Sequence, residues 1–303
     1  MTVPQPARLV ELPQRRRPVQ AVLVALRPRQ WTKNALLFAG IVFAAKLGDW
    51  ARWLEALAAF AAYCAASSAA YLINDVRDAD HDRAHPVKRS RPVARGEIRP
   101  RTAYTIAAVL AGVSIALVAA LGWPSLAFLF GFFVLQAAYT ARLKHVVLID
   151  VMAIAALFVV RAAAGAAGVH VRISPWLLLC TALLALFLAF AKRRGELVLV
   201  GAEATPGRPV LEGYSLELVD QLVTVVAACT VIAYSLYTFT ARDSKALMAT
   251  IPFVVFGVFR YLLLIHRRDL GEEPEEVLLR DRPILACIAA WAVCAAVILI
   301  LTS

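Results

Sequence analysis

The stretch from residue 53 to residue 82 reads WLEALAAFAAYCAASSAAYLI and then NDVRDADHD. The first part is an apolar run of about 20 residues, the length that an α-helix needs to cross the hydrocarbon core of a bilayer. The second part is a burst of acidic residues at the point where this run ends. The whole chain is similarly apolar, because 61% of its 303 residues are hydrophobic and its mean hydropathy is +0.70, whereas soluble domains are about 45–50% apolar. The sequence therefore predicts a helical membrane protein with a polar cluster at one membrane surface.

Apolar runs of similar length recur along the chain, separated by Pro, Gly and charged residues. They predict an all-α polytopic membrane protein with about nine transmembrane helices, of which the first is the weakest. The predicted spans are residues 31–47, 53–73, 102–122, 124–143, 146–167, 174–191, 218–240, 246–265 and 283–302. No soluble domain fits between them, so we expect residues 26–303 to form a single transmembrane domain. Residues 1–25, rich in Pro and Arg, are expected to be a basic tail that is disordered or lies at the membrane interface.

Positive charge is divided unequally between the two sides of the predicted bundle. Most of the 32 Lys and Arg residues fall in the N-terminal segment and in alternate gaps between spans. Because cytoplasmic loops collect positive charge, we expect the N-terminus and these gaps to be cytoplasmic in a multi-pass protein of the inner (plasma) membrane. The net charge of +11 does not indicate a nucleic-acid partner, since the basic residues lie in short gaps between apolar runs.

Three oxygen-bearing side chains in the acidic burst recur at helical spacing. Asn74, Asp78 and Asp82 are four residues apart, so a continuing helix would present them on one face. Such a set suits Mg²⁺, a hard cation that takes a few carboxylates and completes its octahedron with waters and substrate phosphates. Asp75 and Asp80 are expected to point elsewhere. The alternative is a solvated acidic helix end balanced by neighbouring arginines.

A basic segment follows the acidic one. Residues 85–96 read HPVKRSRPVARG, which places Lys88, Arg89 and Arg91 close in sequence to the carboxylates. Cations beside a metal site are what a metal-bridged diphosphate requires. A loop that only orients the protein in the membrane would explain the cations but not the acids beside them. The two segments together favour a diphosphate-binding enzyme with Asn74, Asp78 and Asp82 as its catalytic metal ligands.

The pattern Asn74-x3-Asp78-x3-Asp82, followed by Lys88-x2-Arg91-Pro92-x3-Gly96 at the end of the second predicted span, resembles the UbiA superfamily of intramembrane prenyltransferases. The resemblance extends over essentially the whole chain. It implies a UbiA-like bundle with a cytoplasmic-side active site. In that family the first acidic motif, and a second one between spans six and seven, hold Mg²⁺ and a diphosphate above a lipid-accessible cavity.

The second motif departs from the DxxxD pattern of the aromatic prenyltransferases. Residues 192–196 read KRRGE, residues 214–220 read YSLELVD, and no DxxxD occurs between residues 192 and 220. Together with RPRQWTKN at residues 27–34, this looks like the branch that contains decaprenyl-phosphate phosphoribosyltransferase. The resemblance implies transfer of 5-phosphoribose from phosphoribosyl diphosphate to a polyprenyl (decaprenyl) phosphate, with release of diphosphate, in the synthesis of cell-wall arabinan precursors. An acceptor that is already an anion needs no general base.

This assignment gives further side chains a role in substrate binding. The candidates are Lys33, Lys88, Arg89, Arg91, Tyr139, Arg142, Lys144, Arg161, Lys192, Arg193, Glu196, Tyr214 and Asp220. An anchoring role at the membrane surface is an equal alternative for Tyr139, Arg142 and Lys144. Arg161 lies deep in the fifth predicted span, where a charge is costly, so we prefer a structural tie to another span and leave a ligand role open.

Two other functions are alternatives. An aromatic prenyltransferase that uses a polyprenyl diphosphate would need the first motif, but the missing second DxxxD argues against it. A transporter would show inverted repeats or paired helices broken by Gly and Pro, with polar residues at the midplane, and we find none. The expected partners are therefore phosphoribosyl diphosphate, a polyprenyl phosphate and the bilayer, with Mg²⁺ as cofactor and no nucleic acid. The sequence leaves open whether the chain forms a homo-oligomer.

Overall fold

The computed structural model describes residues 15–43, 48–84, 88–203, 209–240, 244–267, 277 and 280–302. Within this part of the chain all regular structure is helical, as predicted. Eight of its helices are long and apolar enough to span a membrane, which confirms a multi-pass helical protein. They are α3 (Trp50–Arg77), α5 (Pro100–Ala119), α6 (Trp123–Ala141), α7 (Ile149–Gly168), α8 (Pro175–Glu203), α9 (Leu216–Thr240), α10 (Ile251–Arg267) and α12 (Arg282–Leu301), and the span of α10 begins with the preceding 3₁₀ turn at Ala246.

Shorter helices precede, connect or follow these spans. They are α1 (Pro18–Leu26), η1 (Pro28–Phe38), α2 (Ala39–Phe43), α4 (Ala79–Ala84), η2 (Lys88–Ser90), η3 (Leu143–His145), η4 (Pro209–Gly213) and η5 (Ala246–Thr250), where η denotes a 3₁₀ helix. Several helices begin at or next to proline, as α1, α5 and α8 do, because the first turn has no use for the missing N–H. α1 falls inside the expected N-terminal tail, and residues 1–14 lie outside the described residues, so the nature of the tail stays a prediction.

The chain forms two compact units. The first contains the described residues up to Trp31 together with Ala65–Val113, and the second contains Thr32–Cys64 and the described residues from Ser114 onward. The core of the first unit is made largely of small side chains, with Ala21 and Ala25 of α1 packed together with Leu72 of α3 and Ala103 of α5. The expectation of a single transmembrane domain over residues 26–303 stays a prediction.

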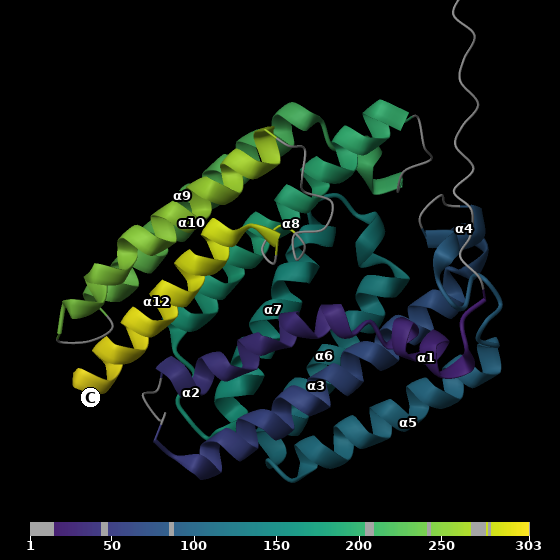
Figure 1. Ribbon diagram of the computed structural model, residues 1–303, viewed down its shortest axis with the longest axis horizontal. Coiled ribbons are helices and arrows are strands. Elements are labelled where there is room, and N and C mark those ends of the chain that lie inside the picture. Colours follow the sequence, from purple (N-terminus) through teal and green to yellow (C-terminus); the bar gives the residue numbers. More distant parts are fainter. Residues whose placement is uncertain are drawn as a thin grey trace, which may run out of the picture. The chain divides into compact units, whose positions relative to one another are not determined.

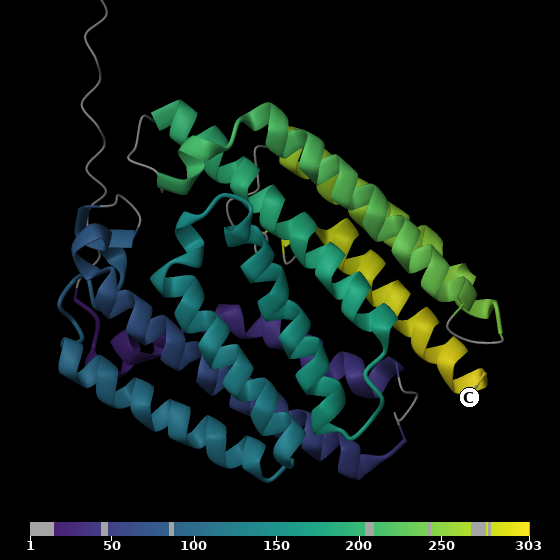
Figure 2. The ribbon, with the colours of Figure 1, turned by 180° about the vertical axis from the view of Figure 1, so that it is seen from behind.

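The second unit is built from helices that pack in chain order. α6 packs on α7, α7 on α8 and α8 on α9, and α10 lies beside both α9 and α12 (Figures 1 and 2). The core of this unit includes Phe187 of α8 and Tyr261 of α10, whose rings meet edge to face with centroids 5.3 Å apart. α2 also packs on α7. These contacts bring the end of α8 close to the starts of α7 and α9, where the charged residues of this unit gather.

The first predicted span, residues 31–47, is not a continuous α-helix. Its described part consists of η1 and the short α2, and residues 44–47 lie outside the described residues. Its side chains nevertheless follow α3 in antiparallel order: Trp31 Nε1 meets Ser68 Oγ at 3.0 Å, Asn34 Nδ2 meets Cys64 Sγ at 3.4 Å, and the Phe38 and Phe60 rings are 5.3 Å apart. As the residue number rises along η1, it falls along α3, so the two segments are antiparallel over these contacts.

The 3₁₀ geometry lengthens this short segment. A 3₁₀ helix rises about 2.0 Å per residue, so the 11 residues of η1 extend about 22 Å. The 5 residues of α2 add about 8 Å at the α-helical rise. The sum is about 30 Å, which is the thickness of the hydrocarbon core. The eight long helices match the second to ninth predicted spans, and a crossing by residues 31–47 stays a prediction.

Candidate functional site

The acidic motif keeps helical register although two helices are assigned across it. α3 ends at Arg77 and α4 begins at Ala79, yet Asp78 N donates to Asn74 O at 2.9 Å and Asp82 N donates to Asp78 O at 2.8 Å. These i to i+4 bonds are those of a continuing α-helix, so the three predicted ligands follow one helical face. Asn74 Nδ2 also donates to Asp78 Oδ2 at 3.0 Å, which makes the Asn74 amide oxygen the atom suited to a cation.

Two arginines neutralise the buried carboxylates of this motif. Arg91 Nη1 lies 2.7 Å from Asp82 Oδ2 and 3.4 Å from Asp75 Oδ1, and Arg27 pairs with the same oxygen of Asp75. Asp75 is 1% exposed and Asp82 is 4% exposed. Among the described residues, Asp75 Oδ2 has no hydrogen-bond partner. The expectation that Asp75 points away from the site is therefore corrected, because a shared arginine joins it to Asp82.

Arg27 reaches the motif from the C-terminal end of α1. Its backbone adopts the left-handed region with φ 53°, a conformation that non-glycine residues adopt only when their surroundings hold it. Its guanidinium lies 4.8 Å from the centre of the Tyr71 ring. The ring contact and the ion pair to Asp75 together hold this side chain at the end of α3.

The other predicted residues of the first unit lie around this network. Lys88 and Arg89 are half-buried on η2, next to Ser90, whose carbonyl accepts from Arg16 Nη1 at 3.0 Å. Asp80 is exposed and pairs with Arg83, so it takes no part in the network. Whether Lys88 and Arg89 bind substrate stays a prediction.

The donor set fits a hard divalent cation in chemistry. Two carboxylates and an amide oxygen are the ligand types that Mg²⁺ takes. No three His, Cys, Asp or Glu side chains in the described ranges are arranged as a metal site, so the ligands would have to include Asn74 and the substrate. Asp82 is presently engaged by Arg91, and a cation would meet this carboxylate in exchange for the arginine.

A second charged cluster lies in the second unit, where α7, α8 and η4 meet. Arg193 of α8 is fully buried, with Nε 2.7 Å from Asp150 Oδ2, and it also pairs with Glu196 one turn along. Tyr214 donates its hydroxyl to Asp150 Oδ1 at 2.7 Å and accepts from the Leu148 backbone N at 2.7 Å. Burial and the bond to Asp150 raise the pKa of Tyr214, so its phenol keeps its proton. This cluster ties three segments together through one carboxylate.

The second cluster changes what the predicted residues in it can do. Arg193, Glu196 and Tyr214 were predicted to bind substrate, but each is bonded directly or through Asp150 to the others. Arg193 Nη2 is buried and, within the described part of the chain, has no hydrogen-bond partner, so one donor of this side chain is left to meet a ligand. A contact between Arg193 and a phosphate stays a prediction.

The remaining predicted cations of this region lie at the ends of α6 and α8. Tyr139 lies within electrostatic reach of Arg193, Arg142 is exposed after α6, and Lys144 is half-buried on η3. Lys192 is half-buried on α8 directly before Arg193. Their contacts with substrate stay predictions.

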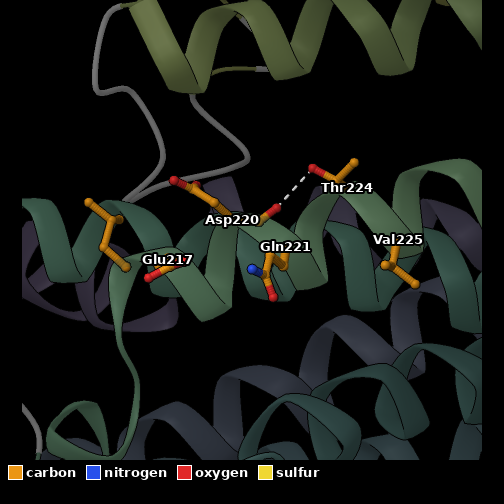
Figure 3. A pocket seen from close by; sticks show the side chains of 6 residues that line it. Glu217, Asp220, Gln221, Thr224 and Val225 are labelled. Atoms are coloured by element: carbon orange, nitrogen blue, oxygen red, sulfur yellow. Dashed lines mark hydrogen bonds between the residues drawn. The ribbon is translucent and has the colours of Figure 1, made fainter.

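Asp220 belongs to a different set of contacts. Arg194 Nε donates to Asp220 Oδ1 at 2.7 Å and Arg194 Nη1 donates to the Ile265 carbonyl at 2.7 Å, which ties α8, α9 and α10. Beside Asp220 an open groove follows the first turns of α9 and is lined by Leu216, Glu217, Asp220, Gln221, Thr224 and Val225 (Figure 3). The hydroxyl of Thr224 donates to the Asp220 carbonyl at 2.9 Å. With two carboxylates on its wall, the groove is unsuited to an anionic donor.

Arg161 is buried inside the second unit, as its position in a span predicts. Its Nε donates to Asn34 Oδ1 at 2.9 Å and its Nη1 to the Leu157 carbonyl at 3.0 Å, and its guanidinium lies 4.8 Å from the centre of the Phe132 ring. These contacts tie α7 to η1 and α6, which is the structural role that we preferred. Lys33, one residue before Asn34, is half-buried on η1.

Sequence reasoning set Asp75 aside and did not include Arg27 or Asp150 among the predicted site residues. Arg27 and Asp75 are 48 residues apart, and Arg193 and Asp150 are 43 apart, so no local spacing connects them. One signal was present, because each of these carboxylates lies at the edge of an apolar run, where a charge needs a partner.

Comparison with known proteins places this geometry in a family. Residues 35–279 match the UbiA prenyltransferase family. The chain is 35% identical over 282 residues to decaprenyl-phosphate phosphoribosyltransferase from Mycobacterium tuberculosis, covering 90% of this chain and 92% of the relative. It is 34% identical over 293 residues to the protein of the same name from Mycolicibacterium smegmatis, covering 90% of each. In fold it is similar to a solved UbiA homolog from Archaeoglobus fulgidus bound to GPP and Mg²⁺, with 21% identity, a TM-score of 0.71, and coverage of 92% of this chain and 99% of the other.

Proposed function

Since the chain belongs to the UbiA prenyltransferase family, we propose that it is a membrane phosphoribosyltransferase that moves 5-phosphoribose from phosphoribosyl diphosphate to a polyprenyl phosphate and releases diphosphate. One observation carries this proposal: relatives named decaprenyl-phosphate phosphoribosyltransferase align with nine-tenths of the chain at 34–35% identity. The lack of a second DxxxD between residues 192 and 220 agrees with it, because that motif is typical of the aromatic prenyltransferases that use a prenyl diphosphate. The product would serve as a precursor of cell-wall arabinan.

The reaction exchanges one bond at the anomeric carbon of the ribose. The carbon–oxygen bond to diphosphate breaks with its electron pair going to diphosphate, and a phosphate oxygen of the lipid forms the new bond. The nucleophile is already an anion, so the protein has to align it and stabilise the leaving charge rather than remove a proton. Charged and hydrogen-bonding side chains of the kind found in both units suit that task.

The first unit is proposed to hold the cation and the diphosphate. Asn74, Asp78 and Asp82 would take Mg²⁺, which when bound supplies positive charge to the leaving diphosphate. Arg91 is 25% exposed at its side chain and lies beside these carboxylates, so its guanidinium can reach a phosphate on the same side. Lys88 and Arg89 lie just before Arg91, on η2.

The second unit is proposed to supply further phosphate contacts. Lys192 and Lys144 are half-buried cations next to the Arg193 cluster, and Arg142 is exposed beside them. The donor carries a 5-phosphate that a prenyl diphosphate lacks, so it needs extra cations. The basic gaps in which these residues lie are proposed to be cytoplasmic, where a water-soluble sugar diphosphate is within reach.

The test is a direct transfer assay with purified protein in detergent. Incubation with radiolabelled phosphoribosyl diphosphate, decaprenyl phosphate and Mg²⁺ should give a labelled lipid, and a prenyl diphosphate with 4-hydroxybenzoate should give no product. Asp78→Asn should lower the transfer rate at least a hundredfold because it removes a metal ligand charge. Asp80→Asn, an exposed carboxylate on the neighbouring helix, should change the rate less than twofold. A prenylated aromatic product, with no labelled lipid, would replace the phosphoribosyl assignment by an aromatic prenyltransferase.

A further inference from the structure

Arg91 occupies a carboxylate that the proposed cation needs. Its Nη1 lies 2.7 Å from Asp82 Oδ2, and Asp82 is 4% exposed, so this is a partly desolvated ion pair rather than a loose surface contact. A buried carboxylate keeps its charge when a cation balances it. Binding of a divalent ion at Asp82 therefore requires Arg91 to give up this contact.

A second carboxylate is already in place for the displaced arginine. The same Nη1 of Arg91 lies 3.4 Å from Asp75 Oδ1, which is at the long end of a hydrogen bond. Asp75 Oδ2 is buried and has no hydrogen-bond partner among the described residues, which is unfavourable for a buried acceptor. Asp75 thus has one weak contact to Arg91 and one unfilled acceptor.

We propose that Arg91 exchanges carboxylates when the cation binds, leaving Asp82 for Asp75, and that Asp75 is the positioning residue that makes this exchange possible. The inference rests on the proposed function in one respect, since it takes Asn74, Asp78 and Asp82 as the cation ligands. Asp75 does not touch the cation. It acts through Arg91, which it keeps beside the cation with donors free to face a diphosphate.

The contacts of Asp75 suit this role. Arg27 pairs with Asp75 Oδ1, and the Tyr71 ring lies under the Arg27 guanidinium at 4.8 Å, so the Asp75 carboxylate is held from one side and fixed in place. In the present state two arginines and two carboxylates balance, namely Arg27, Arg91, Asp75 and Asp82. When Asp82 turns to a divalent cation, Asp75 is the carboxylate of this network that faces Arg91 as well as Arg27, and without Asp75 the Arg91 side chain would stay on Asp82 and compete with the cation.

The exchange can be tested by a double-mutant cycle of Asp75→Asn and Arg91→Gln in which the affinity for Mn²⁺ is the only quantity measured. Mn²⁺ would be titrated into the purified full chain in detergent and free Mn²⁺ followed by electron paramagnetic resonance. Asp75→Asn should weaken Mn²⁺ binding about tenfold, because Arg91 then has no second partner. Arg91→Gln should tighten Mn²⁺ binding, because the competitor is gone. In Arg91→Gln, adding Asp75→Asn should change the affinity less than threefold, since Asp75 acts through Arg91.

Other results overturn the proposal. If Asp75→Asn weakens Mn²⁺ binding equally with and without Arg91, Asp75 binds the cation or supports the fold directly. If Arg91→Gln leaves Mn²⁺ binding unchanged or weaker, Arg91 does not compete for Asp82, and this arm decides the matter even where Asp75→Asn does not fold. Asp80→Asn is the matched control and should bind Mn²⁺ as the wild type does. Because Mn²⁺ is the only probe, the result does not depend on whether phosphoribosyl diphosphate is the donor.

Discussion

At the scale of single residues, Arg193 shows why a predicted ligand has to be located before it is tested. The side chain is fully buried and holds the carboxylates of Asp150 and Glu196. Removing one partner of a buried ion pair costs about 3–5 kcal/mol because the other charge is left uncompensated. An Arg193→Ala variant would therefore lose activity through instability whether or not Arg193 meets a phosphate. Lys192, half-buried beside it, is the better position at which to measure donor binding.

Tyr214 gives a cleaner test of the same cluster. Tyr214→Phe removes a hydroxyl that donates to Asp150 and accepts from the Leu148 backbone N. We expect a loss of about 1–3 kcal/mol in the free energy of unfolding, since Asp150 is fully buried and its Oδ1 would lose its donor. The measurement is the denaturation midpoint in detergent, compared with Tyr104→Phe, an exposed tyrosine of α5 that should change it little. Equal midpoints for the two variants would show that the hydroxyl contributes no stability.

The direction of the pKa shift of Tyr214 decides how the stability contributed by its hydroxyl depends on pH. The pKa of Tyr214 is raised above its usual value, so the folded state favours the protonated phenol. The contribution to stability is then fully present below the ordinary tyrosine pKa of about 10 and is lost only as the pH rises through the higher pKa of the folded state. Within the neutral range, wild type and Tyr214→Phe should differ by a constant amount.

Residue-level prediction succeeded where local spacing carries the information. The i, i+4, i+8 pattern of Asn74, Asp78 and Asp82 is preserved by backbone hydrogen bonds, and spacing alone was enough to find it. Asp75 could not be placed this way, because its position depends on Arg27 from α1 and Arg91 from beyond η2. A helical wheel shows only on which face of its own helix a residue lies. Its contacts with other helices depend on how the helices pack.

At the scale of elements, hydropathy predicted the long helices well because each is an α-helix whose length matches the bilayer. The first span was the weakest prediction for a physical reason. η1 carries Lys33 and Asn34 in its middle, and it gains length by 3₁₀ geometry rather than by more apolar residues. Its polar Asn34 is satisfied by Arg161 of α7, a partner 127 residues away that no local pattern reveals.

Close packing of η1 and α2 on α7 depends on glycine at two positions. A Cβ on Gly165 would lie 2.7 Å from Leu37 Cα, and a Cβ on Gly40 would lie 2.8 Å from Ala166 Cα. Both neighbours are backbone atoms, which cannot move aside as a side chain can. We therefore expect Gly165→Ala to destabilise the protein by about 1–3 kcal/mol through overpacking, measured as a lower melting temperature in detergent.

The control for this variant is Gly131→Ala in α6, where a Cβ would meet nothing within 4 Å. Alanine is favoured over glycine within a helix by up to about 1 kcal/mol, so Gly131→Ala should leave the melting temperature unchanged or raise it. If Gly165→Ala has the same melting temperature as Gly131→Ala, then η1 and α2 are free to separate from α7, and the fold does not require the tight contact.

At the scale of the whole molecule, two independent patterns bear on how the chain threads the membrane. The sequence places most positive charges in alternate gaps, which predicts a cytoplasmic N-terminus and nine crossings. The structure adds that α1 packs beside Ala103 at the start of α5 and beside Leu72 near the acidic end of α3. A crossing by the segment between α1 and α3 stays a prediction. The distribution of positive charge predicts the orientation of the chain in the membrane. The 3₁₀ geometry of η1 could not be predicted from that distribution.

Single cysteines can test this threading. In a background that lacks the five native cysteines, Val19→Cys on α1 and Thr102→Cys on α5 should react with a membrane-impermeant maleimide only after the cytoplasmic side is opened. Ala246→Cys, exposed on η5 after an odd number of crossings, should react in intact cells. All three side chains are exposed on the protein, and Thr102 and Ala246 lie at the first turns of their spans, at the edge of the membrane. Labelling of Val19→Cys from outside, with Thr102→Cys protected, would mean that residues 28–47 do not cross and that eight spans are the full set. Labelling of Thr102→Cys from outside and protection of Ala246→Cys would instead reverse the whole orientation, and with it the side on which the acidic motif meets its donor.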